Sequence, residues 1–223
     1  MSPTPPDYYG RINPDLLQLI PPDARCILEV GCGAGAMGAA FKASHPQARY
    51  IGLEAMEEPA RRAREVLDLV ICADVESPAL QLSTLPNVDC LIYGDVLEHL
   101  RDPWACLQHH VQLLNSSGTL LACIPNVQHW SALLALLRGE WPVMEEGLFD
   151  RTHLRWFTRS GIEKLLQSSG LTLQEIHPRI FQPDQARAFV QALLPALPAL
   201  AVDPQRLLEG VAPLQYVVVA TRR

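Results

Sequence analysis

A glycine-rich turn at residues 27–35, ILEVGCGAG, is the first feature of this chain that could do chemistry. Its three glycines, Gly31, Gly33 and Gly35, follow a short apolar run and precede a helix-like stretch, with Cys32 between the first two. Glycine lets the backbone turn sharply and come close to a ligand, and the free N–H groups of the following helix point at that ligand. The turn therefore predicts a site for a nucleotide-type cofactor.

Two cofactors fit this turn. The spacing Gly33-x-Gly35-x-x-Gly38 satisfies a dinucleotide fingerprint, and Glu54 lies at a suitable distance along the chain to bind a ribose. One interpretation is therefore an NAD-binding oxidoreductase. A fingerprint of this kind occurs by chance in many proteins, so the acidic residues around and after the turn are needed to distinguish the two cofactors.

S-adenosylmethionine is favoured by acidic residues at the ends of successive predicted strands. Glu29 lies inside the first strand end, where its carboxylate can face the cationic amino group of the methionine moiety. Glu54 ends the second strand and can accept both ribose hydroxyls. Asp74 and the backbone N–H of Val75 follow the third strand and can read the adenine edge. The loop after the fourth strand supplies two more candidates for the cofactor site: Gly94 and Asp95.

These stretches together resemble one known family. ILEVGCGAG, the strand end at Glu54, CADVE at 72–76 and YGDVLEHLRDP at 93–103 are similar to motifs of the class I S-adenosylmethionine-dependent methyltransferases, over roughly residues 26–177. The resemblance implies an α/β, three-layer Rossmann-like methyltransferase fold. It also implies a seven-stranded, mostly parallel sheet whose last strand is antiparallel. The cofactor it implies is S-adenosyl-L-methionine, with S-adenosyl-L-homocysteine as the product.

A segment of about residues 125–157 leaves the fifth predicted strand and is placed to cover a substrate. It contains PN-x-x-HW at 125–130 and DRTHLR at 150–155. Both stretches resemble a subgroup of bacterial methyltransferases found with surface-polysaccharide and glycosyltransferase genes, and the first is also similar to a stretch in a methionine-biosynthesis family. This resemblance favours a small-molecule acceptor, with a sugar or glycoconjugate hydroxyl as the leading hypothesis.

The same segment supplies the candidate catalytic residues. We predict His153, and less strongly His129, as the base that deprotonates the acceptor, because the ordinary pKa of histidine lies closest to neutral pH. Asp150 would orient His153. The alternative is that DRTHLR is a charged loop that ties the segment down, with Asp150–Arg151 or Asp150–Arg155 ion pairs. We expect no metal, because His109 and His110 lie on a helix without a partner carboxylate and the chain has no H-E-x-x-H motif.

The chain alternates apolar runs with helical patterns, which is typical of a parallel sheet covered on both faces. We expect one domain over residues 1–223, with an N-terminal arm at 1–24 and a second insertion at about 178–213. Arg11 in the arm could lie near the cofactor's carboxylate, although the sequence slightly favours an arm that is only anchored by aromatic packing. The predicted strands are Cys26–Val30, Arg49–Glu54, Leu69–Ala73, Val88–Tyr93, Gly118–Ile124, Leu171–His177 and Leu214–Thr221; the predicted helices are Pro14–Ile20, Ala36–Ser44, Pro59–Leu67, Pro103–Leu114 and Ser160–Ser169.

Composition limits the partners. The net charge is −6 and no basic run of five or more occurs, so nucleic acid is not an expected partner. The six cysteines are scattered without a C-x-x-C pair, which favours a reducing cytoplasm. The longest apolar region, Phe189–Val202, is broken by two prolines, so we expect no membrane span. A homodimer is left open, as is a non-catalytic cofactor-binding or scaffold protein with the same fold.

Overall fold

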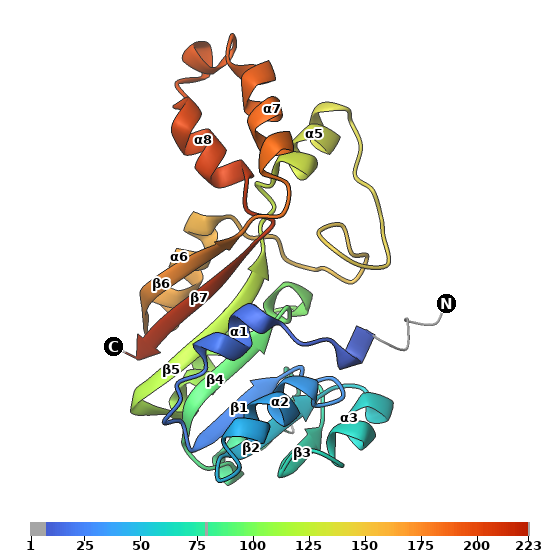
Figure 1. The fold of residues 1–223 in the computed structure, drawn as a ribbon, viewed down its shortest axis with the longest axis vertical. Coiled ribbons are helices and arrows are strands. Elements are labelled where there is room, and N and C mark those ends of the chain that lie inside the picture. The colour runs from blue at the N-terminus through green and yellow to red at the C-terminus, as the bar shows by residue number, and fades with distance from the viewer. Residues whose placement is uncertain (1–7, 79, 223) are drawn as a thin grey trace.

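A seven-stranded sheet forms the centre of the molecule (Figure 1). The computed structural model describes residues 8–78 and 80–222, so residues 1–7 of the predicted arm lie outside the described residues. The strand order is β3-β2-β1-β4-β5-β7-β6, and β7 alone runs antiparallel to both of its neighbours. The predicted fold class is therefore confirmed. The strands are β1 Cys26–Val30, β2 Arg49–Glu54, β3 Leu69–Cys72, β4 Val88–Gly94, β5 Leu114–Pro125, β6 Leu171–Arg179 and β7 Gln215–Arg222.

The central strands are apolar on both faces because both faces are covered by helices. In β1, Leu28 and Val30 belong to one apolar core, and Ile27 belongs to the other. Helices α4 and α6 contribute to the first core, and α1, α2 and α3 contribute to the second, so the fold has three layers. These helices are α1 Pro14–Leu19, α2 Ala36–Ser44, α3 Glu57–Ala63, α4 Pro103–His110 and α6 Arg159–Ser168.

Some predicted boundaries were wrong. Strand β5 is longer than predicted, because it begins at Leu114 rather than at Gly118. Helix α3 begins two residues earlier than predicted and ends at Ala63, and the chain continues from there in turns to Leu67. Between β3 and β4 the described residues form only one short 3-10 turn, Leu82–Thr84, which agrees with the weak helical pattern there.

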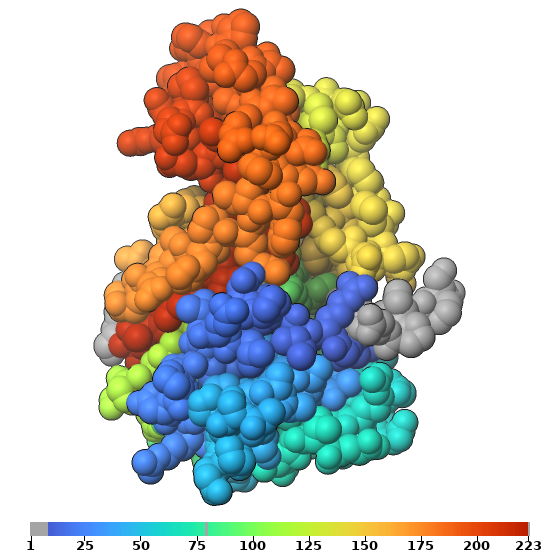
Figure 2. Space-filling view, in the orientation of Figure 1, coloured from blue at the N-terminus to red at the C-terminus, as the bar shows by residue number. Residues whose placement is uncertain are grey.

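Both insertions contribute to one helical lobe beyond the end of the sheet. Helices α5 Trp130–Leu137, α7 Pro183–Leu193 and α8 Pro204–Val211 share an apolar cluster that is separate from the two cores of the sheet. Figures 1 and 2 show this lobe at one end of the molecule, with segment 138–157 running from it toward the N-terminal residues. The sequence does not predict that the two insertions pack together, because helix-to-helix packing across distant segments leaves no local signal.

Asn126 ties this lobe to the sheet. Its side-chain Nδ2 donates hydrogen bonds to the carbonyls of Gly210 (2.8 Å) and Pro213 (2.7 Å), just before β7 begins. The Asn126 side chain is fully buried, so these bonds are strongly favoured over leaving the amide unpaired. In the part of the chain that the structure describes, no helix is long and apolar enough to span a bilayer.

The packing of α2 on the sheet generates a stability prediction. A methyl group on Gly38 would lie 2.4 Å from the Leu67 side chain and 2.6 Å from the Tyr50 ring, whereas one on Gly161 in α6 meets nothing closer than 3.6 Å. We therefore expect Gly38→Ala to lower the free energy of unfolding by about 1–3 kcal/mol. The control, Gly161→Ala, should raise it by about 0.4–1 kcal/mol. Urea denaturation measures both, and equal effects would contradict the packing described for α2.

Candidate functional site

The strand order reverses between β1 and β4, so the chain leaves the carboxyl ends of these neighbours in opposite directions. Ligands of open α/β sheets bind in the crevice that such a reversal creates. Here the crevice is a cavity of about 1110 Å³. It is lined by ten of the eleven residues predicted to bind the cofactor: Arg11, Glu29, Gly31, Cys32, Gly33, Glu54, Asp74, Val75, Gly94 and Asp95.

The glycine turn has the geometry that its sequence predicts. Gly31 and Gly33 have φ of +71° and +53°, a left-handed conformation that favours glycine. A methyl group on Gly33 would lie 2.6 Å from the carbonyl oxygen of Tyr9, which accepts a hydrogen bond from the N–H of Ala34 at 2.8 Å. The N-terminal segment therefore lies directly against the turn.

Gly35 does not line the cavity. It precedes α2 with φ of +79°, and a methyl group there would meet Val66, Leu67 and Ala63. This placement does not support the prediction that Gly35 binds the cofactor. The missing side chain of Gly35 instead lets the start of α2 pack closely against α3 and the turns that follow it. Cys32 does line the cavity, but burial raises the pKa of its thiol well above the usual range, so it stays a neutral thiol there.

Glu29 and Glu54 form the acidic wall of the turn. One Glu54 oxygen accepts the N–H of Gly33 and the other accepts the N–H of Met56, both at 2.9 Å, so this carboxylate holds the turn as well as facing the cavity. Glu29 accepts a hydrogen bond from the Tyr50 hydroxyl at 3.0 Å. Burial raises the pKa of Glu29 to about 8, because a charge is unfavourable away from water.

Asp74, Asp95 and Arg11 line the same cavity and make contacts of their own. Asp74 forms an exposed ion pair with Arg101 at 3.0 Å. Asp95 has φ of +55°, a conformation that aspartate adopts more readily than most residues. Burial raises its pKa to about 6, and Gln215 donates a hydrogen bond to it. Arg11 forms an exposed ion pair with Glu146 at 2.9 Å, which joins the N-terminal segment to segment 138–157, and both residues line the cavity.

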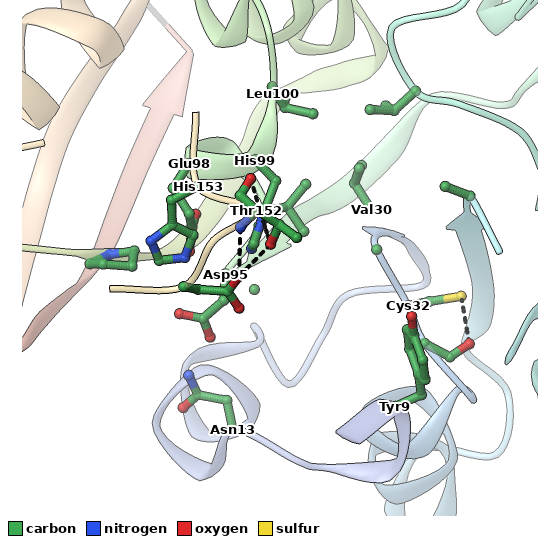
Figure 3. A pocket seen from close by; sticks show the side chains of 18 of the residues that line it. Tyr9, Asn13, Val30, Cys32, Asp95, Glu98, His99, Leu100, Thr152 and His153 are labelled. Carbon is green, nitrogen blue, oxygen red and sulfur yellow. Dashed lines mark hydrogen bonds and ion pairs between the residues drawn. The ribbon is translucent and has the colours of Figure 1, made fainter. Parts of the chain in front are cut away.

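A second group of polar side chains lies at the other side of the cavity (Figure 3). Glu98, His99 and His153 come within 4.8 Å of one another through one carboxylate oxygen and two ring nitrogens. The Nε2 atom of His153 lies 3.9 Å from Oε1 of Glu98. Burial, reinforced by the neighbouring Asp95 charge, raises the pKa of Glu98 well above its usual range. Burial likewise lowers the pKa of both histidines, so their neutral forms are favoured.

Segment 150–157 is held onto the loop after β4 by its backbone. The Glu98 carbonyl accepts the N–H groups of Leu154 (2.8 Å) and Arg155 (2.9 Å), and the Arg155 side chain donates to the Arg101 carbonyl. The segment is thus clamped, as one interpretation of DRTHLR proposed, but not by the expected Asp150 ion pairs. Clamping also brings His153 to Glu98.

Asp150 does not orient His153. Its Oδ1 accepts the N–H and the hydroxyl of Thr152, at 2.7 and 2.6 Å, and Thr152 in turn contacts Nδ1 of His99. The ring of His153 is held instead by the Leu148 carbonyl, 3.3 Å from its Nδ1. The predicted pairing was therefore wrong, because the turn at 150–153 places the Asp150 carboxylate on the Thr152 side.

His129 lies outside the cavity. Its Nδ1 accepts the N–H of Ser131 at the start of α5, and burial lowers the pKa of the ring to about 4. Among the described residues that line the cavity, His129 is absent. The PN-x-x-HW stretch therefore builds the lobe, with Asn126 and His129 as its hydrogen-bonding residues, and does not supply a base.

Sequence reasoning missed Glu98, His99 and Asn13. Five buried side-chain atoms of the described residues lack a hydrogen-bond partner, and three of them, both Glu98 oxygens and Nδ2 of Asn13, belong to residues that line this cavity. Unpaired buried polar atoms mark places where a ligand can complete the bonding. The D-x-x-E-H spacing at 95–99 was visible in the sequence, but its third partner, His153, is distant along the chain.

Comparison with known proteins identifies the family. The family model described as a methyltransferase domain matches residues 7–176, which is most of the chain. The chain belongs to this methyltransferase family. A solved S-adenosylmethionine-dependent methyltransferase from Archaeoglobus fulgidus superposes with a TM-score of 0.61, at 15% identity, covering 90% of this chain and 87% of that one. The fold and the family agree with the predicted cofactor and exclude the oxidoreductase interpretation.

Curated relatives match over shorter stretches. The human mitochondrial ubiquinone biosynthesis O-methyltransferase is 24% identical over 164 residues, covering 70% of this chain and 44% of that protein. A trans-aconitate 2-methyltransferase from Azoarcus sp. is 31% identical over 122 residues, covering 53% of this chain and 47% of that protein. This chain thus spans less than half the length of these relatives.

Proposed function

We propose that this protein transfers the methyl group of S-adenosylmethionine to a hydroxyl oxygen of a small molecule, and that a sugar or glycoconjugate is the acceptor. The observation that carries the proposal is one continuous cavity with two chemically different sides. In Figure 3, Cys32 of the glycine turn lies on one side, and Glu98, His99 and His153 lie on the other. Glu29 and Glu54 also line the cavity, and Glu54 accepts the N–H of Gly33 in the turn. A donor and an acceptor can therefore occupy the same cavity.

The donor is assigned to the side with the glycine turn. The unpaired lone pairs of Glu54 accept the ribose hydroxyls, and Glu29 faces the cationic amino group of the methionine moiety. Asp74 and Val75, after β3, lie beside the adenine. Asn13 and Arg11 also line the cavity, and both can donate hydrogen bonds to the carboxylate of the methionine moiety. Nδ2 of Asn13 has no hydrogen-bond partner among the described residues.

The acceptor is assigned to the side with His153. The sulfonium donor is already activated, so the protein has to align the nucleophile with the methyl carbon and exclude water. A hydroxyl also has to lose its proton, and the neutral His153 imidazole is placed to accept it. The oxygen then bonds to the methyl carbon while the carbon–sulfur bond breaks, and sulfur keeps the electron pair. The O-methyltransferase relative supports an oxygen acceptor, and the resemblance of DRTHLR to the polysaccharide-associated subgroup supports a sugar.

Acceptor identity is tested by incubating the purified chain with S-adenosylmethionine and a panel of acceptors. The panel contains nucleotide sugars and oligosaccharides, phenols, and small carboxylic acids. We expect S-adenosylhomocysteine to form with a sugar acceptor and the sugar to gain one methyl group by mass spectrometry. Turnover only with carboxylic acids would contradict the hydroxyl acceptor, and cofactor binding without turnover on any acceptor would favour a scaffold protein.

Glu29 generates a proton-linkage prediction. Because its pKa is raised to about 8, this carboxyl is mostly protonated at pH 7 in the free protein. An ammonium group beside it lowers that pKa, so binding should release up to about one proton, and affinity should rise as pH increases toward 8. Titration calorimetry in two buffers of different ionisation enthalpy measures the release.

The matched variant for this prediction is Glu29→Gln, which keeps the shape and removes the titrating group. It should bind S-adenosylmethionine more weakly, by roughly 1.5–3 kcal/mol, the range for hydrogen bonds to charged groups. Its binding heat should not depend on the buffer. Equal heats in both buffers for the unmodified protein would show that Glu29 does not meet the amino group.

His153 generates a catalytic prediction. His153→Ala should reduce kcat by about 10²–10⁴-fold, the usual contribution of a positioned proton acceptor, without changing cofactor affinity. The control is His109→Ala, because His109 is exposed on α4 away from the cavity. A loss of thermal stability with unchanged turnover per folded molecule would instead show that His153 only holds the clamp.

The pH dependence of turnover follows from the same histidine. Burial lowers the pKa of His153 below its ordinary value of about 6.5, so the imidazole is neutral at pH 7 and becomes protonated only in more acidic solution. We therefore expect kcat to be constant near neutrality and to fall as pH drops through this lowered pKa. A fall that begins above pH 7 would contradict the assignment.

A further inference from the structure

We propose that Glu98, His99 and His153 bind one divalent transition-metal ion at the acceptor side of the cavity. Their candidate ligand atoms lie within 4.8 Å of one another, on two segments that are 54 residues apart in the chain and are clamped together by their backbones. This site departs from the expectation of no metal, which rested on the absence of local motifs.

The first argument is the state of the Glu98 side chain. It is 2% exposed, and neither of its oxygens has a hydrogen-bond partner among the described residues. A buried carboxylate without donors is costly, and proteins ordinarily pair such groups or let them coordinate a metal. The surrounding charges, Asp95 and Asp150, are negative and do not compensate it. The Arg179 guanidinium lies toward Asp95, where it bonds Asp15 and Gln215.

The second argument is the orientation of the two imidazoles. Nδ1 of His153 lies 3.3 Å from the Leu148 carbonyl, and Nδ1 of His99 lies 3.3 Å from the Thr152 carbonyl and 3.0 Å from its hydroxyl. A carbonyl can only accept, so each Nδ1 carries the hydrogen and each Nε2 keeps its lone pair. Metal-binding histidines are commonly held this way, by donating their other ring N–H to a backbone carbonyl.

The ligand atoms lie slightly farther apart than they would around a bound metal ion. Metal–ligand bonds of about 2.0–2.2 Å place neighbouring ligand atoms about 3.0–3.5 Å apart. The His153–Glu98 pair is at 3.9 Å and all three ligand atoms lie within 4.8 Å of one another, so side-chain rotations that bring them about 1–2 Å closer complete the site. Two imidazoles and one carboxylate favour zinc, manganese, iron or cobalt over magnesium or calcium, which prefer oxygen ligands.

Three protein ligands leave coordination positions open toward the cavity. Resting on the proposed function, the site would activate the acceptor: a hydroxyl bound there has a lower pKa and loses its proton to solvent. Its oxygen bonds to the methyl carbon as the carbon–sulfur bond breaks, and the products are the methyl ether, neutral S-adenosylhomocysteine and one proton. When the metal is bound, Nε2 of His153 is a ligand, so the metal takes over the activation of the hydroxyl; the imidazole acts as the base only in the metal-free protein.

The test uses the full chain after treatment with a chelator and its removal, with Co²⁺ as the probe. We expect one Co²⁺ per chain, seen as visible d–d absorption, with micromolar or tighter affinity and an increase in Tm. Glu98→Gln and His99→Gln should each weaken Co²⁺ binding at least tenfold, and circular dichroism checks that both variants are folded. Zn²⁺ and Mn²⁺ should compete for the site, and Mg²⁺ at equal concentration should not.

The control is His177→Ala. His177 and Glu175 form an exposed pair at 2.9 Å on β6, so this variant removes a surface histidine–carboxylate pair while leaving the cavity unchanged. It should bind Co²⁺ like the unmodified chain. The site is disproved if the unmodified chain binds no Co²⁺, or if Co²⁺ binding persists in the Glu98→Gln and His153→Ala variants.

Metal binding is measured without cofactor or acceptor, so it stands or falls separately from the proposed methyl transfer. If the chain binds Co²⁺ but methyl transfer runs equally fast in metal-free protein, the activating role is wrong and the imidazole base stands. If no acceptor is methylated with or without metal, the proposed function fails while the metal site remains.

Discussion

The parallel pairing of β1 with β2 on one side and β4 on the other is the constraint on which the rest of the structure depends. It aligns Leu28 with Ile51 and with Leu91, so three strands end together at one edge of the sheet. The chain must then leave that edge by sharp turns, which Gly31 and Gly33 allow. Because strand order reverses here, the turns separate and a cavity opens between them.

The acidic side chains that line this cavity differ in the number of hydrogen bonds that they accept. Glu54 is satisfied by two backbone N–H groups that belong to the turn itself, so it is part of the fold before any ligand arrives. Glu29 has one hydroxyl partner, and Glu98 has no hydrogen-bond partner among the described residues. The buried carboxyls with the fewest partners are therefore the groups that would gain most from a cationic ligand, which we propose is an ammonium group at Glu29 and a metal ion at Glu98.

The segment of about residues 125–157 connects the cavity to the helical lobe. It leaves β5 at Asn126, whose amide is fixed to the loop before β7, and it returns to the sheet where the Glu98 carbonyl holds Leu154 and Arg155. These two attachments set the position of His153 over the loop after β4.

The sequence by itself determined the sheet and the cofactor side of the site. Apolar runs buried on both faces, glycines at left-handed positions and acids at strand ends are local patterns, so β1, β2 and α2 were predicted to the residue, and ten of the eleven cofactor candidates line the cavity. Tertiary structure alone decided the acceptor side. The sequence offered both His153 and, less strongly, His129 as the base, but the start of α5 holds His129 and a backbone clamp brings His153 to Glu98. Glu98 and His153 lie far apart in the sequence and meet only when the chain folds back on itself. Such a contact leaves no periodic pattern in the sequence from which it could be predicted.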